Sequence, residues 1–490
     1  MRLAGEFWIN SDNETSFGEI EIGGEDSKLT IAGKELSAFK DAEVIYGETY
    51  DWKKLTCIGC IPEQWSGPSM GSRDIRRLQI FPHFVLAGRI YFNPQLDKIR
   101  RMLFRFTDAD EIFHDDRKFG SFNQLDRTLL DQLQSTAQLD NVFHSDAVLN
   151  YFSGPKKIFS VDTKIGVVSA YYVFPDSGDG SLSTHIEISI EFPEAIELKS
   201  SIDSLMDLRS FFTVFCGRPQ RIYDLRVLVT ESNILSNRIA LLDVHWSYAP
   251  NGPKHANSRL PARYSMPMHV THAPEEFASI LQSWLVRQKA WGDCRYYFVQ
   301  CLEAEIFYDT SRLIMVVNLF DIIPINDIPD LFELPDNFLS KLDVIQSIVD
   351  SLPAGFDREL ISGSVGMVRN RSRQKDFKLY QKVSARAQIV KENVGAKLEN
   401  LDTVLVAAIK TRNHFVHGSR LRFENISDYL QLMTDALEFV FAFSDLMDAG
   451  WDGAKWLDIS SRHKFGIYIR KHQDEIHDFL LAWEQANLKA

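Results

Sequence analysis

Up to about residue 248, hydrophobic and polar positions alternate along much of the chain, in short runs separated by turn residues. The clearest run is 185–192, where Ile186, Ile188, Ile190 and Phe192 share one face and polar side chains share the other. This alternation is typical of a strand with one buried and one solvated face. Similar runs predict strands at 7–10, 19–22, 54–61, 78–92, 99–106 and 167–174, a helix near 201–215, and more strand up to Trp246.

The hydrophobic spacing changes after residue 273. Residues 249–273 contain several prolines and an Asn-Gly pair without sustained periodicity, so we expect a connector there. Helical spacing follows and predicts helices at 274–289, 296–323, 337–352, 375–394, 401–417, 428–447 and 463–486. The predicted fold class is α+β, with a β-rich N-terminal domain at 1–248 and an all-α helix bundle at 274–490.

The helix expected at 401–417 has the clearest boundaries. Asn400 is suited to the N-cap position, and Gly418 is suited to the C-terminal stop. The side chains expected to face the core recur at helical spacing. They are Val404, Ala408, Thr411 and Phe415.

Composition sets limits on what the protein does. The net charge of -13 over 490 residues argues against a protein that coats nucleic acid, so any basic contact surface is local. Five cysteines are few for this length and odd in number, which predicts reduced thiols. The N-terminus lacks the apolar core of a signal peptide, and the apolar runs are too short to span a bilayer. We therefore expect a cytoplasmic protein without a membrane partner.

One tract stands out against the acidic background. Basic side chains crowd residues 369–397, with only Asp376 and Glu392 opposing them, and two arginines follow residue 418. Phosphates would be drawn to such a surface, whereas an ordinary solvated helix face is the equal alternative. The residues that we assign to a predicted RNA surface are Arg369, Arg371, Arg373, Lys375, Lys378, Lys382, Arg420 and Arg422.

The end of the helix at 401–417 carries candidate chemistry. Arg412 supplies a permanent cation, and His417 supplies a group that titrates near neutral pH. On an ideal helix the two lie about 140° apart around the axis and roughly 7.5 Å apart along it, so we expect no tight pair within one chain. Asn413 shares a face with His417 and is expected to orient the imidazole or contact RNA. A two-fold axis that joins two copies of this helix would complete the site, so we expect a homodimer.

These residue types suit RNA cleavage without a metal. RNA carries its own nucleophile, the 2′-hydroxyl, and His417 can move the protons while Arg412 stabilises the charge on the phosphoryl group. The expected products are a 2′,3′-cyclic phosphate and a 5′-hydroxyl. The alternative is an arginine and a histidine that are favoured at a helix C-terminus by the macrodipole.

These residues also resemble a known family. The pattern from Arg412-Asn413 to His417 resembles the signature of HEPN ribonucleases, and residues 405–418 resemble their ApeA-like branch. The β-rich half is similar to the N-terminal domain that accompanies this branch. The segments that carry this similarity are Gly5-Glu6-Phe7-Trp8, Gly18-Glu19-Ile20 and Leu55-Thr56-Cys57-Ile58-Gly59.

The resemblance implies a dimeric, metal-independent endoribonuclease that defends bacteria against phage by abortive infection, with tRNA among the RNAs it would cut. It implies no cofactor. The N-terminal domain would sense a phage-derived trigger or restrain the nuclease. Members often carry an acidic residue in the first bundle helix, and Asp321 is the residue we assign to that position, with an exposed helix carboxylate as the alternative.

Other readings of the motifs are weaker. Cys57 and Cys60 have the spacing of half a zinc site or of a redox pair, but no second pair of ligands has matching spacing, so we expect buried thiols. His414 and His417 lack a third ligand nearby in sequence, and we expect no metal there. The main alternative function is a non-catalytic bundle that binds RNA or a partner protein.

Overall fold

The computed structural model describes residues 1–9, 15–34, 36–66, 76–124, 128, 132, 135, 147–152, 154–174, 184–230, 239–248, 266–324, 338–373, 379–394, 398, 400–421, 423, 426–454, 468 and 473–488. The chain divides into two compact units, Met1–Phe212 with Gln220–Val286 and Thr213–Pro219 with Arg287–Ala490. Most of the predicted connector, residues 249–265, lies outside the described residues. The predicted domain boundaries therefore stay predictions.

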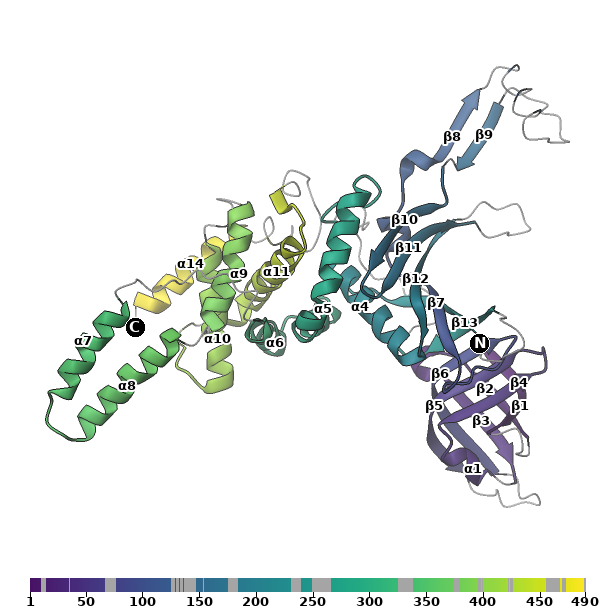
Figure 1. Ribbon diagram of the computed structural model, residues 1–490, viewed down its shortest axis with the longest axis horizontal. Coiled ribbons are helices and arrows are strands. Elements are labelled where there is room, and N and C mark those ends of the chain that lie inside the picture. The colour runs from purple at the N-terminus through teal and green to yellow at the C-terminus, as the bar shows by residue number, and fades with distance from the viewer. Residues whose placement is uncertain are drawn as a thin grey trace. The chain divides into compact units, whose positions relative to one another are not determined.

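Six antiparallel strands at the N-terminus close into a barrel, drawn in purple and blue in Figure 1. They pair in the order β6-β3-β2-β1-β4-β5, and β5 pairs again with β6. Alternate side chains of these strands fill the interior, which is the arrangement that period-two sequence predicts. The strands are β1 (Arg2–Trp8), β2 (Ser16–Glu21), β3 (Lys28–Gly33), β4 (Val44–Thr49), β5 (Lys54–Ser66) and β6 (Arg76–Gly88).

Two glycines make room for the side chain of Phe7 on β1. Phe7 is fully buried inside the barrel. A Cβ atom on Gly18 of β2 would lie 2.8 Å from its ring, and one on Gly47 of β4 would lie 2.5 Å from it. Only glycine permits the ring to lie against both neighbouring strands.

The long strand β6 joins the barrel to an open sheet. Its residues 76–80 pair with β3, while residues 84–88 pair with β14. From β14 the antiparallel order continues as β13-β7-β12-β11-β10, and β8 with β9 forms a separate two-stranded sheet. The strands are β7 (Lys98–Phe106), β8 (Phe119–Gln124), β9 (Ala147–Phe152), β10 (Lys157–Thr163), β11 (Gly166–Val173), β12 (His185–Ile196), β13 (Ile222–Thr230) and β14 (Ile239–Trp246).

The open sheet is covered by an aromatic cluster. Helix α4 (Leu198–Cys216) places Phe212 against Phe106 of β7 with ring centroids 4.3 Å apart. Phe277, from the start of α5 (Pro274–Glu303), packs against Phe212 and Phe113. The buried face expected for the strand at 185–192 is confirmed, since its isoleucines and Phe192 are all buried. The other face is not solvated throughout, because Ser189 is 1% exposed. The short helices of this region are α1 (Ser37–Lys40), α2 (Ala109–Ile112), η1 (Gly24–Asp26) and η2 (Asp116–Lys118).

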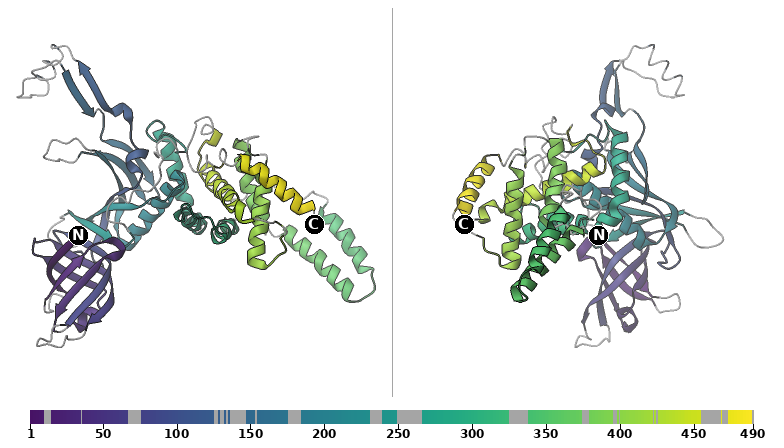
Figure 2. Two further views of the ribbon diagram at one scale, coloured as in Figure 1. Left: turned by 180° about the vertical axis from the view of Figure 1, so that it is seen from behind. Right: turned by 60° about the vertical axis from the view of Figure 1, so that its left-hand side comes forward.

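The C-terminal part is helical, as predicted, and the fold class is α+β. None of the helices in the described part of the chain is both long enough and apolar enough to cross a membrane. Figure 2 shows α7 and α8 as an antiparallel hairpin, and these two helices contact one another. Beyond α5, the helices are α6 (Thr310–Ile322), α7 (Phe338–Asp350), α8 (Phe356–Arg373), α9 (Leu379–Val394), α10 (Leu401–His417), η6 (Ile426–Tyr429), α11 (Leu430–Asp448) and α14 (Gln473–Leu488).

The helix predictions were wrong in three places. The helix expected at 274–289 continues without a break to Glu303 as α5. The single helix expected at 296–323 is broken after Glu303, because Asp309 begins a new helix by accepting a hydrogen bond of 2.8 Å from the backbone N–H of Arg312. Helix α8 was not predicted, since its glycines and charged residues give a weak apolar pattern. For the helix expected at 463–486, α14 begins at Gln473, and residues 463–467 and 469–472 lie outside the described residues.

Helix α11 is the centre of the bundle and is buried at nearly every position from Leu430 to Leu446. Three carboxylates lie within this buried stretch, and each has a partner on another helix or the loop before it. The hydroxyl of Tyr308 donates to Asp435, and Nε and Nη2 of Arg312 donate to Glu438 at 2.8 and 3.0 Å. Buried carboxylates need such partners because they lose their hydration.

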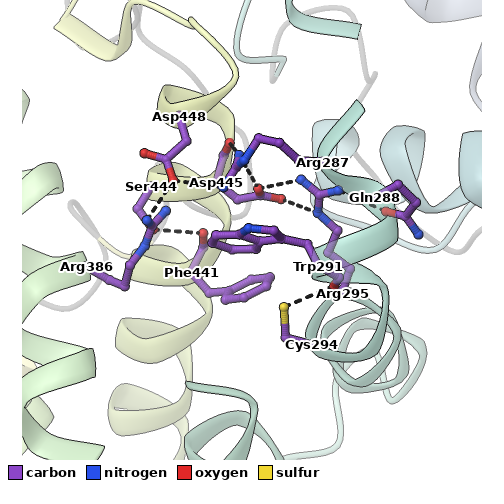
Figure 3. A network of polar contacts seen from close by, with 10 residues as sticks. All are labelled: Arg287, Gln288, Trp291, Cys294, Arg295, Arg386, Phe441, Ser444, Asp445 and Asp448. Atoms are coloured by element: carbon purple, nitrogen blue, oxygen red, sulfur yellow. Dashed lines mark hydrogen bonds and ion pairs between the residues drawn. The ribbon is translucent and has the colours of Figure 1, made fainter. Parts of the chain in front are cut away.

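The third carboxylate, Asp445, is at the centre of the network in Figure 3. Arg295 of α5 donates to both of its oxygens at 2.7 and 3.0 Å, and Arg287 donates at 3.0 Å. Arg386 of α9 pairs with Asp448 at 2.7 Å, and all three guanidiniums lie within 5.4 Å of the ring centre of Trp291. Burial acts to raise the pKa of Asp445, but Arg295 and the other guanidiniums bring this pKa below its usual value.

We predict that Asp445→Asn lowers the free energy of unfolding at neutral pH by about 3 to 5 kcal/mol, because the buried guanidinium of Arg295 loses its counter-charge. The pKa of Asp445 is lower in the folded state, so its contribution is present above the unfolded value of about 3.9 and is lost as the pH falls through the folded value. Urea denaturation should show that wild type and variant differ less in their free energy of unfolding at about pH 3 than at neutral pH.

The control is Asp402→Asn, because the carboxylate of Asp402 is 51% exposed and its partner is the side chain of Lys391. This variant should lose less stability at neutral pH. Equal losses for the two variants would contradict the central role of Asp445.

Candidate active site

The last turn of α10 presents the predicted site. The helix ends at His417, and Gly418 adopts the left-handed conformation with a φ of 65°. Its backbone N–H donates to the backbone carbonyl of His414 at 3.0 Å. The C-terminal stop is confirmed, and Asn400 occupies the N-cap position without a side-chain cap bond. The predicted core stripe is correct except for Phe415. This side chain is 43% exposed and lies in the last turn of the helix, where no side chain is buried.

The site is built on a direct pair within one chain. Nη1 of Arg412 lies 2.8 Å from Nε2 of His417, so the expectation that these residues do not pair in one chain was wrong. The extended arginine side chain spans the separation that an ideal helix gives the two backbones. Since a guanidinium only donates, Nε2 of His417 accepts and carries no proton in this arrangement.

Two asparagines fix the guanidinium. Nε of Arg412 donates to the side-chain oxygen of Asn318 on α6 at 2.8 Å, and Nη1 also donates to that of Asn413 at 3.0 Å. Asn413 therefore contacts Arg412 rather than His417. Asn318 was missed by the sequence analysis, although it is the one polar side chain in the apolar run 313–320, which is a signal that could have identified it.

The charge of Arg412 is not neutralised by these contacts. Both asparagines are neutral, and among the described residues no carboxylate forms an ion pair with this guanidinium. Arg295 and Arg312 differ, since each is paired with a buried carboxylate. In the described part of the chain Nη2 of Arg412 also has no hydrogen-bond partner. The arrangement can therefore bind an anion such as a phosphate beside a neutral imidazole.

Asp321 lies on α6 one turn after Asn318 and is exposed. Its backbone carbonyl accepts a hydrogen bond from Nζ of Lys382. No described contact joins its carboxylate to Arg412 or His417, and its assignment to the site stays a prediction.

The predicted basic surface is only partly described. Lys382 is 8% exposed and Arg386 is fully buried, because each bonds to groups inside the bundle. We correct the prediction by leaving Lys382 out of the RNA surface. Arg420 is exposed. The remaining members are placed as follows: Arg369, Arg371 and Arg373 belong to α8, while Lys375, Lys378 and Arg422 lie outside the described residues.

The two cysteines that have the spacing of half a metal site lie on β5. Cys57 is buried on β5 and Cys60 is half-buried, and both are free thiols. Burial raises the pKa of Cys57 and raises that of Cys60 to about 12, so both thiols are protonated at neutral pH. Within the described ranges, no three histidine, cysteine or acidic side chains are grouped closely enough to hold a metal ion.

The fold and site define an α+β protein with a closed barrel, an open sheet and a helical bundle that carries an Arg–His pair. The model of the ApeA N-terminal domain 1 family matches residues 2–284, and the chain belongs to this family. The expected resemblance to this domain is confirmed. The match ends before the Arg–His pair. The search of curated proteins and the search of solved structures gave no match to the chain.

We predict that the neutral imidazole of His417 carries its proton on Nδ1, because Nε2 accepts from Arg412. Nitrogen-15 NMR of histidine-labelled protein should show this tautomer for His417. Arg412→Met removes the donor and should shift His417 toward the Nε2-protonated form that free imidazoles prefer. A wild-type His417 with its proton on Nε2 would contradict the pairing.

Proposed function

We propose that the chain is a metal-independent HEPN endoribonuclease that acts in anti-phage defence by abortive infection and cleaves cellular RNA, with tRNA as one substrate class. The observation that carries this proposal is the guanidinium of Arg412, which is held by two neutral amides against the unprotonated Nε2 of His417. This arrangement combines an uncompensated cation with a proton acceptor, which are the two groups that phosphodiester transfer needs.

The reaction follows from the chemistry of these groups. His417 accepts the proton of the RNA 2′-hydroxyl, whose oxygen attacks the adjacent phosphorus. Arg412 donates to the phosphoryl oxygens and stabilises the charge that develops on them. The bond to the 5′-oxygen breaks, and this leaving oxygen takes up a proton. The products are a 2′,3′-cyclic phosphate and a 5′-hydroxyl.

A second copy of the chain would supply a second imidazole. One histidine cannot accept the first proton and donate the second at the same time, so two copies of α10 would divide the work. Phe415 and Val416, next to His417, are 43% and 44% exposed. Exposed apolar side chains beside a charged pair suit an interface between two copies. We therefore propose a homodimer that joins through the bundle.

The remaining parts take roles around this centre. Arg420 and the arginines of α8, residues 369, 371 and 373, would bind the RNA backbone. The β-rich unit, which holds almost all of the family match, would sense a phage-derived trigger or restrain the nuclease. The second candidate function is a bundle that binds RNA or a partner protein without cutting, because the open Nη2 of Arg412 can also hold a phosphate in a stable complex.

We predict that Arg412→Ala and His417→Ala each reduce RNA cleavage by at least about a hundredfold, since each removes one of the two reacting groups. Cleavage is measured with purified protein and total RNA, and RNA ends are sequenced from cells that express wild type or His417→Ala. A metal chelator should leave wild-type cleavage unchanged.

The matched control is His414→Ala. His414 lies in the same helical turn, and its ring nitrogen faces the backbone carbonyl of Ser419 rather than Arg412. This variant should retain cleavage. Retained cutting in Arg412→Ala or His417→Ala would refute the assigned roles, and binding without cutting by the wild type would favour the second function.

We also predict that Asn318→Asp slows cleavage by roughly tenfold or more. The substitution keeps an acceptor near Nε of Arg412 but adds a carboxylate. This carboxylate neutralises the positive charge of Arg412, which then attracts a phosphate less strongly. Asn393→Asp on the exposed side of α9 is the control for the added charge. Unchanged cleavage by Asn318→Asp would show that the neutrality of this amide is irrelevant.

A further inference from the structure

The barrel carries a cavity that the proposed nuclease chemistry does not use. It has a volume of about 740 Å³, which lies within the range of roughly 300 to 1,000 Å³ that is typical of ligand sites. Its walls come from the outward faces of β1 and β4, from the turn after β4 and from the segment after β6. Aromatic and acidic side chains dominate this lining. They are Glu6, Trp8, Glu48, Tyr50, Trp52 and Tyr91.

Two carboxylates face one another across the wall of the cavity. Glu6 of β1 and Glu48 of β4 are direct partners in the antiparallel register. Like charges in this position destabilise a sheet. In the described part of the chain no lysine or arginine forms an ion pair with either. Among the described residues, Glu48 has one side-chain hydrogen bond, which the hydroxyl of Tyr91 donates to it at 2.5 Å.

A lysine of the chain already contacts one ring of the aromatic wall. Lys54 lies beside Glu48 in the register of β4 and β5. Its Nζ atom lies over the ring of Tyr91, 4.8 Å from the centre, instead of forming an ion pair with the carboxylate. The ring of Tyr91 is held by an edge contact with Trp8, with centroids 5.5 Å apart. The wall therefore offers π-faces to positive charge.

The turn after β4 adds two exposed rings. Tyr50 is 65% exposed and Trp52 is 81% exposed. Trp52 has a φ of 66°, which is unfavourable for a bulky side chain. The buried Thr49 fixes the turn, because its hydroxyl donates to Asp51 and accepts from the backbone N–H of Lys53. The turn thus holds an indole at the rim of the cavity at a cost in backbone energy.

We propose that this cavity binds an organic cation, an ammonium or guanidinium group, between the rings of Trp8, Trp52 and Tyr91 and beside the carboxylates of Glu6 and Glu48. A cation is attracted to the faces of all three rings and relieves the repulsion between the two carboxylates. An anion would meet both carboxylates, and a neutral sugar would leave their repulsion in place. The proposal goes beyond the nuclease function and does not depend on it.

The test uses the full-length protein and its tryptophan fluorescence, titrated at constant ionic strength. The probes are spermidine, choline and a tri-arginine peptide, which distinguish a free amine from a basic protein side chain, with glucose and glutamate as neutral and anionic comparisons. At least one cationic probe should bind saturably, and glucose and glutamate should not. The proposal would be overturned if none of the three cationic probes bound saturably, or if glucose bound and the cations did not.

Variants locate the binding. Glu6→Gln and Glu48→Gln should each lower the affinity for the cationic probe by roughly tenfold, because each removes one charge-assisted contact. Trp52→Ala should also lower this affinity. Glu63→Gln should not, because Glu63 is an exposed carboxylate on β5 outside the cavity lining. The unfolding temperature of the ligand-free Glu6→Gln protein should equal or exceed that of the wild type, since the repulsion is relieved. Undiminished affinity in both glutamine variants would refute the site.

Discussion

The buried carboxylates of α11 are the constraint on which the bundle depends. Because α11 is enclosed on nearly all sides, each acid needs a partner on a neighbouring helix or loop, and these partners determine where the neighbours lie. Glu438 fixes α6 through Arg312, and Asp445 fixes α5 through Arg295. Helix α6 then carries Asn318 to the guanidinium of Arg412. The geometry at the exposed end of α10 therefore depends on ion pairs deep in the bundle.

Arginine has two distinct roles in this unit. Arg295 and Arg312 are paired with buried carboxylates, which neutralise their charge and hold the helices together. Arg412 is held by amide oxygens, which supply the same hydrogen-bond geometry without the opposite charge. A guanidinium held in this way is positioned and still attractive to a phosphate. The choice of acceptor, rather than the arginine itself, distinguishes a structural cation from one suited to a site.

Local patterns predicted the elements better than their contacts. The bounds of α10 and its stop at Gly418 followed from spacing and a cap, which are local properties. The pairing of Arg412 with His417 was missed because helix geometry places backbones and ignores side-chain reach. Asn318 lies 94 residues from its partner, and Lys382 is buried through a carbonyl 61 residues away. Such distant contacts leave little trace in one sequence.

Neither candidate site has a described ion pair that neutralises its charge, and the charges of the two sites have opposite signs. Arg412 in the bundle is an uncompensated cation, whereas Glu6 and Glu48 in the barrel are opposed anions. One ligand cannot satisfy both by the same chemistry, because a polyphosphate that suits Arg412 is repelled by the barrel carboxylates. If the bundle acts on RNA, a ligand of the barrel cavity is therefore a different molecule. A cation-binding cavity in the family domain would therefore be an input separate from the substrate, which is the arrangement that a sensor needs.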